Sequence, residues 1–277
     1  MLINISRRRG GNYRLLVPQE NISHPRKAIG PPKKMKPRLF TLTALATLVS
    51  TIALANAEPA KQEKGVRFDP VTRMIEGWKI HVDPAMLKGE HSATGEKSLR
   101  MLANHLQRIA ILVQGESLKK LRTCEIWIEH SHPTLHSMQY HPGAGWLKSN
   151  GHDPRLVKKV HIPQAKALLS RGQLLKHPAV VLHELAHAYH DQFLSFEHPA
   201  VIAAYKKAKD AGSYDRVMLF TGQNVRHYAM TNHKEYFAEG TEAYFYRNDF
   251  YPFVRAELKK HDPDLHRVME RVWGPAR

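Results

Sequence analysis

Val180-Val181-Leu182-His183-Glu184-Leu185-Ala186-His187-Ala188-Tyr189 is an apolar run that carries the pattern H-E-x-x-H. On a helix, His183 and His187 stand one turn apart on the same face, so both imidazoles can reach one metal ion. Glu184 then points to the side of that face, where it can act as a general base without binding the metal. The competing interpretation is a pair of hydrogen-bonded core histidines, but it leaves Glu184 without a role inside a buried helix.

A second helical segment, Glu235-Tyr236-Phe237-Ala238-Glu239, carries a carboxylate at each end. Apolar and aromatic neighbours indicate that the segment is buried, and a buried carboxylate needs a metal or a hydrogen-bonding partner. We assign Glu235 to the metal and Glu239 to a hydrogen bond with a ligand imidazole, while the reverse assignment stays open. His190 shares the helix face of His183 but lies roughly 10 Å further along. We therefore expect His190 to line the pocket or to support the ligands.

Two neutral imidazoles and one carboxylate are the ligand set of a hydrolytic Zn²⁺ site. They leave the site with a net positive charge, which preserves the Lewis acidity of the ion. The same ligands can hold Fe(II) in an oxygenase. A glutamate directly after the first histidine fits hydrolysis better than oxygenation. The sequence therefore predicts zinc as the cofactor.

The run from Tyr228 to Glu239, YAMTNHKEYFAE, resembles the third-ligand segment of anthrax-lethal-factor-type metallopeptidases, a group within the gluzincins. In that family a Tyr-x-x-Thr-Asn-x-x-Glu-aromatic-Phe-Ala-Glu stretch follows H-E-x-x-H at a similar distance. The resemblance implies that Glu235 binds zinc and that Tyr228 stabilises the oxyanion or protonates the leaving group. It covers residues 180–246 and implies active-site helices beside a small sheet. The family's substrate preference does not carry over.

Tyr228 also has a plausible role without the resemblance, because a phenol near the metal can donate a hydrogen bond to a developing oxyanion. The competing interpretation is a packing tyrosine. His227 is the alternative donor.

Residues 35–57, MKPRLFTLTALATLVSTIALANA, combine a short basic segment, an apolar run and an A-x-A cleavage pattern. This is the pattern of a secretory signal peptide. An uncleaved membrane anchor is the alternative, but the run is short and interrupted by hydroxyl groups. Met35 is then the expected start, and residues 1–34 form a non-native or disordered upstream segment. We expect residues 58–65 to be flexible and the mature chain to be secreted or periplasmic, without stable membrane association.

The formal charge of +17 comes largely from the first 57 residues, which hold ten of the 42 Lys and Arg residues and one of the 25 acidic residues. The remaining 32 basic and 24 acidic residues give 58–277 a net charge of +8, spread along the chain. This distribution is not that of a nucleic-acid binder. The single cysteine, Cys124, excludes an internal disulfide and is predicted to be a buried, inert thiol.

Residues 66–277 are predicted to form one α+β domain of zincin-like architecture, mainly helical with a small mixed sheet. Apolar patterns predict strands at 78–82, 122–129 and 159–162. Residues 131–154 are rich in Pro, Gly and His, which predicts an irregular loop. Helices are predicted at 99–113, from His177-Pro178 to about 196, at 199–211 and 234–246, with two short ones after Pro252 and Pro263.

A second group of histidines lies in the predicted loop: His130, His132, His136 and His141. It could bind another metal, but irregular spacing favours solvent-facing or substrate-facing side chains. An extended peptide is expected to pair with an edge strand near the metal helix, formed by 159–162 or by the loop through Tyr140 and Trp146.

These observations predict an exported zinc metalloendopeptidase that hydrolyses peptide bonds in a protein or peptide substrate. The alternative is a non-catalytic zinc-binding module that binds peptides or cell-wall material. The intact Glu184 argues against the alternative.

Overall fold

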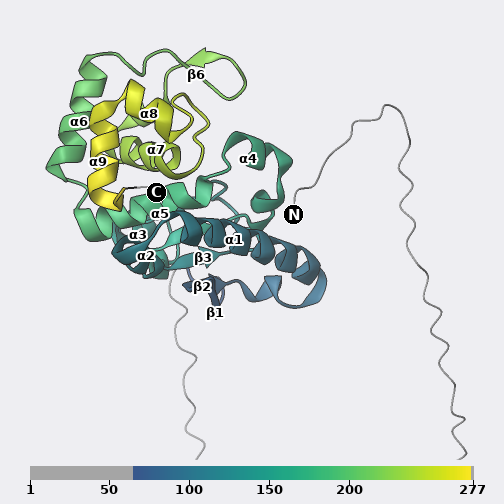
Figure 1. Ribbon diagram of the computed structural model, residues 1–277. Helices are drawn as coiled ribbons and strands as arrows, with labels where there is room; N and C mark the ends of the chain where they lie inside the picture. The colour runs from purple at the N-terminus through teal and green to yellow at the C-terminus, as the bar shows by residue number, and fades with distance from the viewer. Residues whose placement is uncertain (1–64, 276–277) are drawn as a thin grey trace, which may run out of the picture. The chain divides into compact units, whose positions relative to one another are not determined.

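The computed structural model describes residues 65–275 of the chain. The predicted signal peptide at 35–57, the segment 1–34 before it and residues 58–64 of the predicted flexible segment lie outside the described residues. The described part is an α+β structure, mainly helical with a small mixed sheet, as predicted (Figure 1). Within residues 65–275, no helix combines the length and hydrophobicity that crossing a bilayer requires.

The main sheet has five strands in the order β1-β2-β3-β5-β4. β1 (Val71–Ile75) and β2 (Trp78–Val82) form an antiparallel hairpin. Its two-residue turn, Glu76-Gly77, has φ angles of 51° and 91°, the backbone that tight hairpins need. β2, β3 (Ile126–Ile128) and β5 (Val160–Ile162) are parallel, and β4 (Gln139–Tyr140) pairs antiparallel with β5. β4 is therefore an edge strand.

The two faces of the sheet differ because side chains alternate along each strand. Ile126, Ile128 and their neighbours on β2 and β5 enter the main core with α1 (Ser92–Leu112) and α5 (Val180–Tyr189). On the opposite face, Trp127 packs against Leu147 of α3 (Ala144–Ser149). The main core therefore holds α5 beside β4 and β5.

The C-terminal helices are α6 (Pro199–Asp210), α7 (His233–Phe245), α8 (Arg255–His261) and α9 (Pro263–Trp273), with a small ribbon formed by β6 (Val217–Met218) and β7 (Asn224–Val225). Of these helices, α7 packs against α5, and the others pack against α7. Buried Asp262 accepts hydrogen bonds from the hydroxyls of Tyr214 and Tyr236, at 3.1 and 2.5 Å, and from the backbone N–H of Leu265. One carboxylate thus joins α7 to the start of α9.

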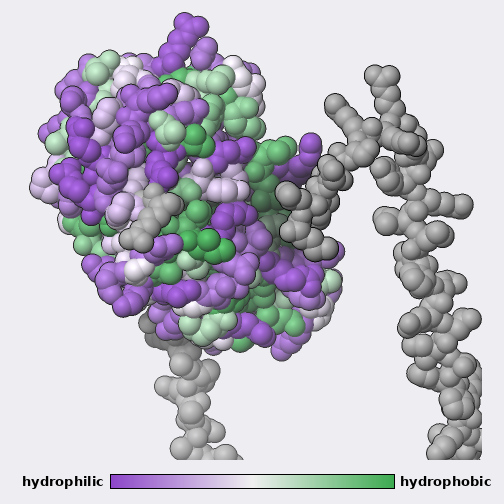
Figure 2. Space-filling model, in the orientation of Figure 1, coloured by the Kyte–Doolittle hydropathy of each residue, from purple (hydrophilic) through white to green (hydrophobic). Residues whose placement is uncertain are grey.

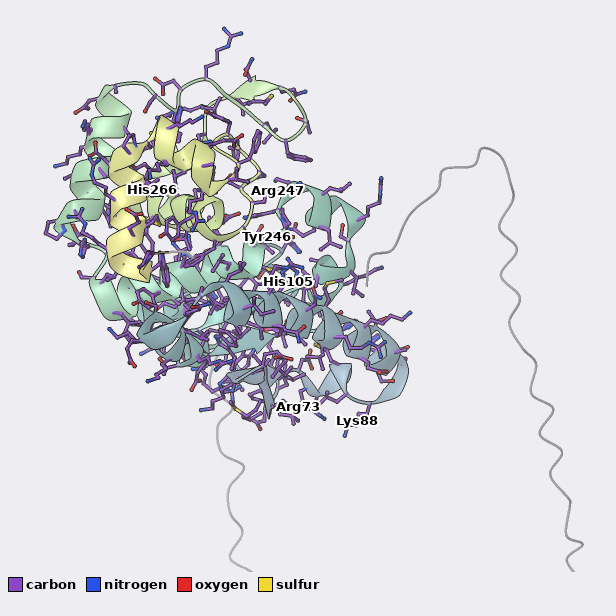
Figure 3. The ribbon with its side chains drawn as sticks, viewed as in Figure 1. Arg73, Lys88, His105, Tyr246, Arg247 and His266 are labelled. Atoms are coloured by element: carbon purple, nitrogen blue, oxygen red, sulfur yellow. The ribbon has the colours of Figure 1, made fainter. Side chains whose placement is uncertain are left out.

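Side chains also connect α1 to the end of α7. His105 and Tyr246, both labelled in Figure 3, line a small cavity of about 10 Å³. The Arg108 guanidinium lies 4.6 Å from the centroid of the Tyr246 ring. Most of the surface visible in Figure 2 is hydrophilic, as expected where the apolar side chains fill the interior.

Several element boundaries differ from the prediction. The structure adds β1, α2 (Gly115–Arg122) and α4 (Arg171–Lys176), and the predicted loop at 131–154 contains β4 and α3. The strand predicted at 122–129 is only three residues long. The predicted helix beginning at Pro178 starts instead at Val180, and after Tyr189 it continues as a π-helix from His190 to Leu194. The helices predicted near Pro252 and Pro263 are present as α8 and α9.

Candidate metal centre

Helix α5 presents two imidazoles to one point. All ten of its residues are buried, and the Nε2 atoms of His183 and His187 lie 3.1 Å apart. The spacing of four residues places these side chains on adjacent turns of one face. A histidine pair in such an environment needs polar partners, because burial without them is costly.

Helix α7 supplies the third group. Asn232 caps the helix, and its Oδ1 accepts the backbone N–H groups of Lys234 and Glu235 at 2.9 and 3.0 Å. This cap places Glu235 in the first turn, with its Oε2 3.1 Å from Nε2 of His183 and 3.2 Å from Nε2 of His187. Burial acts to raise the pKa of Glu235, but hydrogen bonds from the two imidazoles outweigh it and lower that pKa. The carboxyl is therefore an anion.

The spacing of these three atoms fits a metal ion. Bonds of about 2.0–2.1 Å to a tetrahedral ion place ligand atoms about 3.3–3.4 Å apart. The three observed separations are 3.1, 3.1 and 3.2 Å. The Nδ1 atom of His183 lies 2.6 Å from Oε1 of Glu242 and donates to it, so a metal ion at the common point would take the place of the proton on Nε2. His183, His187 and Glu235 could therefore hold zinc.

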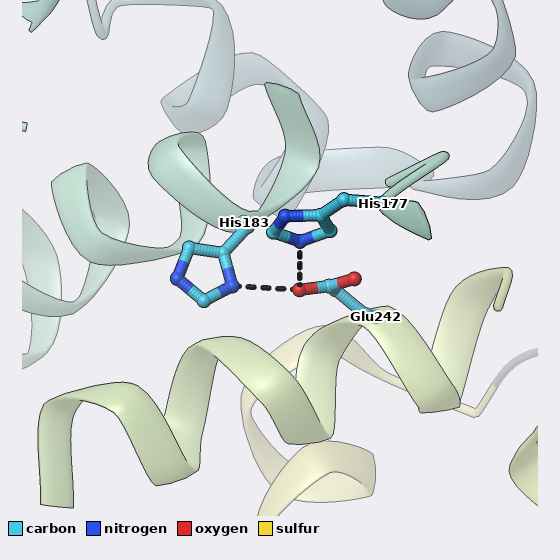
Figure 4. Close-up of side chains that lie close together, drawn as sticks. All are labelled: His177, His183 and Glu242. Carbon is cyan, nitrogen blue, oxygen red and sulfur yellow. Dashed lines mark hydrogen bonds and ion pairs between the residues drawn. The ribbon is translucent and has the colours of Figure 1, made fainter. Parts of the chain in front are cut away.

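The hydrogen-bond partner of the Nδ1 atom of His183 differs from the prediction. We expected a ligand imidazole to donate to Glu239, but Glu242 occupies that position in the structure (Figure 4). The closest Glu239 oxygen lies 3.8 Å from Nδ1 of His183, and Asn248 donates to Glu239 at 2.7 Å. The same Glu242 oxygen also accepts a hydrogen bond from Nε2 of His177 at 2.8 Å. Sequence reasoning did not identify His177.

The two buried carboxyl groups next to His183 differ in charge. Burial and the adjacent Glu242 raise the pKa of Glu239. Burial would also raise the pKa of Glu242, but His177 and His183 lower it more strongly. Glu242 is therefore the ionised member of the pair.

Glu184 and Tyr228 lie beside the three candidate ligands. Both line the two cavities that open next to His183. Tyr228 is 49% exposed, at the start of a short 3₁₀ segment, and burial of its inner part raises the pKa of its hydroxyl. The alternative donor, His227, is buried, accepts the backbone N–H of Ala229 at 3.1 Å and lines neither cavity. The structure therefore brings Tyr228, not His227, to the candidate ligands.

His190 is separated from this group. It is fully buried, with its ring centroid 4.5 Å from that of Phe237 and 5.2 Å from that of Phe196. Neither ring nitrogen has a hydrogen-bond partner, and burial lowers the pKa of the ring to about 3. His190 lines neither cavity beside His183 and makes no hydrogen bond to the ligands. Its position is that of a neutral packing side chain.

The cleft extends on both sides of the candidate ligands. A first cavity of about 340 Å³ and a second of about 230 Å³ share Met138, His183, Glu184 and Tyr228 in their linings. Edge strand β4 lines the second cavity, so the loop through Tyr140 provides the strand next to α5, whereas 159–162 lies inside the sheet. A chain that crosses this cleft would pass Glu184 and Tyr228.

The loop histidines separate into two groups. His136 is exposed and lines the first cavity, as expected. The expectation is wrong for His132 and His141, which are buried. Nε2 of His141 lies 3.2 Å from Nδ1 of His161, whose Nε2 lies 3.0 Å from Glu129. In residues 65–275, three donors converge closely enough for one ion only in two sets, neither of which includes a loop histidine: His183–His187–Glu235 and His177–His183–Glu242.

Comparisons with known proteins give a structural likeness and no match to a family model or a curated sequence. Among solved structures, the Pro-Pro endopeptidase of Paenibacillus alvei is similar, with 18% sequence identity and a TM-score of 0.40. The match covers 70% of this chain and 95% of that one. A likeness of this size assigns neither a fold family nor an activity.

Proposed function

We propose that this chain is a zinc-dependent endopeptidase. The observation that carries the proposal is the convergence of His183, His187 and Glu235, with separations of 3.1, 3.1 and 3.2 Å, in a cleft that also contains Glu184 and Tyr228. When bound there, zinc would act as a Lewis acid on the scissile carbonyl and would lower the pKa of a water.

The side chains of the cleft have distinct roles in this proposal. Glu184 takes a proton from the attacking water as its oxygen bonds to the carbonyl carbon. It then passes this proton to the nitrogen of the leaving amine as the C–N bond breaks. Tyr228 donates a hydrogen bond to the oxyanion that develops on the carbonyl oxygen. The two cavities leave room for substrate residues on both sides of the scissile bond, which favours cleavage within a chain.

The decisive experiment is a cleavage profile of residues 58–277 against an unbiased peptide library in the presence of zinc. We expect cleavage at internal bonds, its loss with a chelator and its recovery when zinc is restored. Glu184→Gln is the matched control, because it keeps the metal ligands and removes the base. Elemental analysis of both proteins before zinc is added distinguishes zinc from iron. Equal, negligible cleavage by the two zinc-loaded proteins would favour a non-catalytic binding module instead.

We also propose that residues 35–57 direct export. The proposal rests on the basic, apolar and A-x-A succession in that stretch. Intact-mass measurement of the exported protein should give a chain that begins at Glu58. A cell-associated product that retains 35–57 would contradict cleavage and favour a membrane anchor.

A further inference from the structure

His177 precedes α5 and reaches the buried carboxylate behind the metal ligands. Its backbone closes α4, with the N–H donating to the carbonyl of Gln173 at 2.8 Å. Its side chain is 18% exposed, lines the first cavity and donates from Nε2 to Oε1 of Glu242 at 2.8 Å. The chain His177–Glu242–His183 thus joins the segment before α5 to α7 and returns to α5 (Figure 4).

Glu242 depends on both imidazoles. Its side chain is fully buried, its Oε1 accepts both hydrogen bonds and its Oε2 has no partner. An ionised carboxylate in such surroundings is costly unless donors compensate it. Without His177, Oε1 would keep only the hydrogen bond from His183, and the carboxylate would be held from one side. The orientation of Glu242 is therefore set from two sides.

We infer that His177 is a positioning residue of the metal centre, acting through Glu242 on His183. Glu242 would keep the proton of His183 on Nδ1 when Nε2 binds the metal, and His177 fixes Glu242. Outer partners of this kind change metal affinity by about 10- to 100-fold when they are removed. The inference rests on the zinc site of the proposed function but not on catalysis.

The same three residues could hold an ion themselves, because their donor atoms lie within 4.8 Å of one another. The distances favour hydrogen bonds. Glu242 Oε1 lies 2.6 and 2.8 Å from the two nitrogens, shorter than the roughly 3.3–3.4 Å between ligands of a tetrahedral zinc ion. The His183–His187–Glu235 separations approach that value, whereas these do not.

The test measures zinc binding by residues 58–277, by competition with a chromophoric chelator and by elemental analysis. His177→Ala should bind one zinc about 10- to 100-fold more weakly and should change the visible spectrum of the cobalt(II)-substituted protein. His177→Gln should recover most of the affinity, because its amide N–H can donate to Glu242. His136→Ala is the control, since His136 lines the same cavity without touching Glu242.

Two results would overturn the inference. One is a zinc affinity of His177→Ala within about threefold of wild type. The other is a wild-type protein that binds two zinc ions and a His177→Ala variant that binds one, which would make the trio an ion site. If His177→Ala does not fold, as judged by circular dichroism, His177→Leu gives the same comparison, because its side chain fills more of the space and has no donor for Glu242. In a protein that already carries Glu242→Ala, the further change His177→Ala should not alter zinc affinity, because His177 acts through Glu242.

These readouts do not depend on turnover. A chain without peptidase activity whose zinc affinity depends on His177 would refute the hydrolase and keep the positioning role. An active peptidase whose zinc affinity is independent of His177 would support the hydrolase and refute the positioning role.

Discussion

Nε2 of His187 and Oε2 of Glu235 lie 3.2 Å apart, although 48 residues separate them in the chain. Helix α6 and the β6–β7 ribbon occupy that interval, and α7 returns to pack along α5. Because Glu235 makes this contact and Glu239 does not, we expect substitutions of these two carboxylates to affect zinc binding differently.

Glu235→Ala should abolish stoichiometric zinc binding, because it removes one of three convergent ligands. Glu239→Gln is the matched comparison. It should retain one zinc per chain, because its oxygen can still accept from Asn248 and it lies 3.8 Å from His183. Elemental analysis after dialysis measures both. Zinc retained by Glu235→Ala and lost from Glu239→Gln would instead support Glu239 as the third ligand.

Tyr228→Phe should lower kcat by about 10²- to 10³-fold with little change in KM, the effect expected when an oxyanion donor is removed. Steady-state kinetics on a peptide found in the library screen provide the measurement, and zinc content should not change. Tyr228 is half exposed, so the substitution should leave stability unaffected. An unchanged kcat would assign Tyr228 to packing or substrate contact only.

Gly95→Ala should destabilise the fold by about 1–3 kcal/mol or more. A Cβ atom at Gly95 would stand 2.1 Å from the carbonyl oxygen of Met86, where α1 crosses the preceding 3₁₀ turn. Gly145→Ala is the control, with no atom within 4 Å of the added Cβ. Because Gly145 is exposed in a helix, that change should stabilise by up to about 1 kcal/mol. Urea unfolding measures both, and equal effects would contradict the close approach.

Acid should destabilise the protein through the histidines on the far face of the sheet. Burial lowers the pKa of His141 and His161 from the usual 6.5 to about 3. Below pH 6.5 the unfolded chain binds protons that the folded chain excludes, so stability is complete above pH 6.5 and falls toward pH 3. Each group contributes a slope of about 1.4 kcal/mol per pH unit.

The corresponding measurement is the free energy of unfolding between about pH 7 and pH 4, with chelator present so that metal binding does not contribute. His161→Gln should reduce the slope of the free energy of unfolding against pH by about 1.4 kcal/mol per pH unit, because glutamine does not titrate. A slope identical to wild type would show that His161 is protonated in the folded state.

Helices α5 and α7 and their candidate ligands were predictable because the pattern that indicates them is local. Four-residue spacing places His183 beside His187 on any helix, and the polar groups within apolar runs identified α5 and α7. The choice of Glu242 over Glu239 was not predictable. Both lie on the same face of α7, and only the crossing of α7 over α5 decides which one reaches His183.

The missed features have other causes, which differ from one to the next. β1 has largely exposed residues, so its strand carries no apolar alternation. β4 is two residues long, below the length at which a period can be recognised. His132 and His141 are buried because α3 and the following 3₁₀ turn cover the far face of the sheet, a tertiary effect that loop composition does not reveal.

Cys124 gives the protein a reporter of its own opening. It is the single thiol in the chain, fully buried, and burial beside Asp191 raises its pKa to about 12. An alkylating reagent reacts with thiolates, so the native thiol is doubly protected, by exclusion and by protonation. The rate of alkylation therefore follows the population of opened chains. One label read by mass spectrometry would track how often the part of the main core around Cys124 becomes accessible.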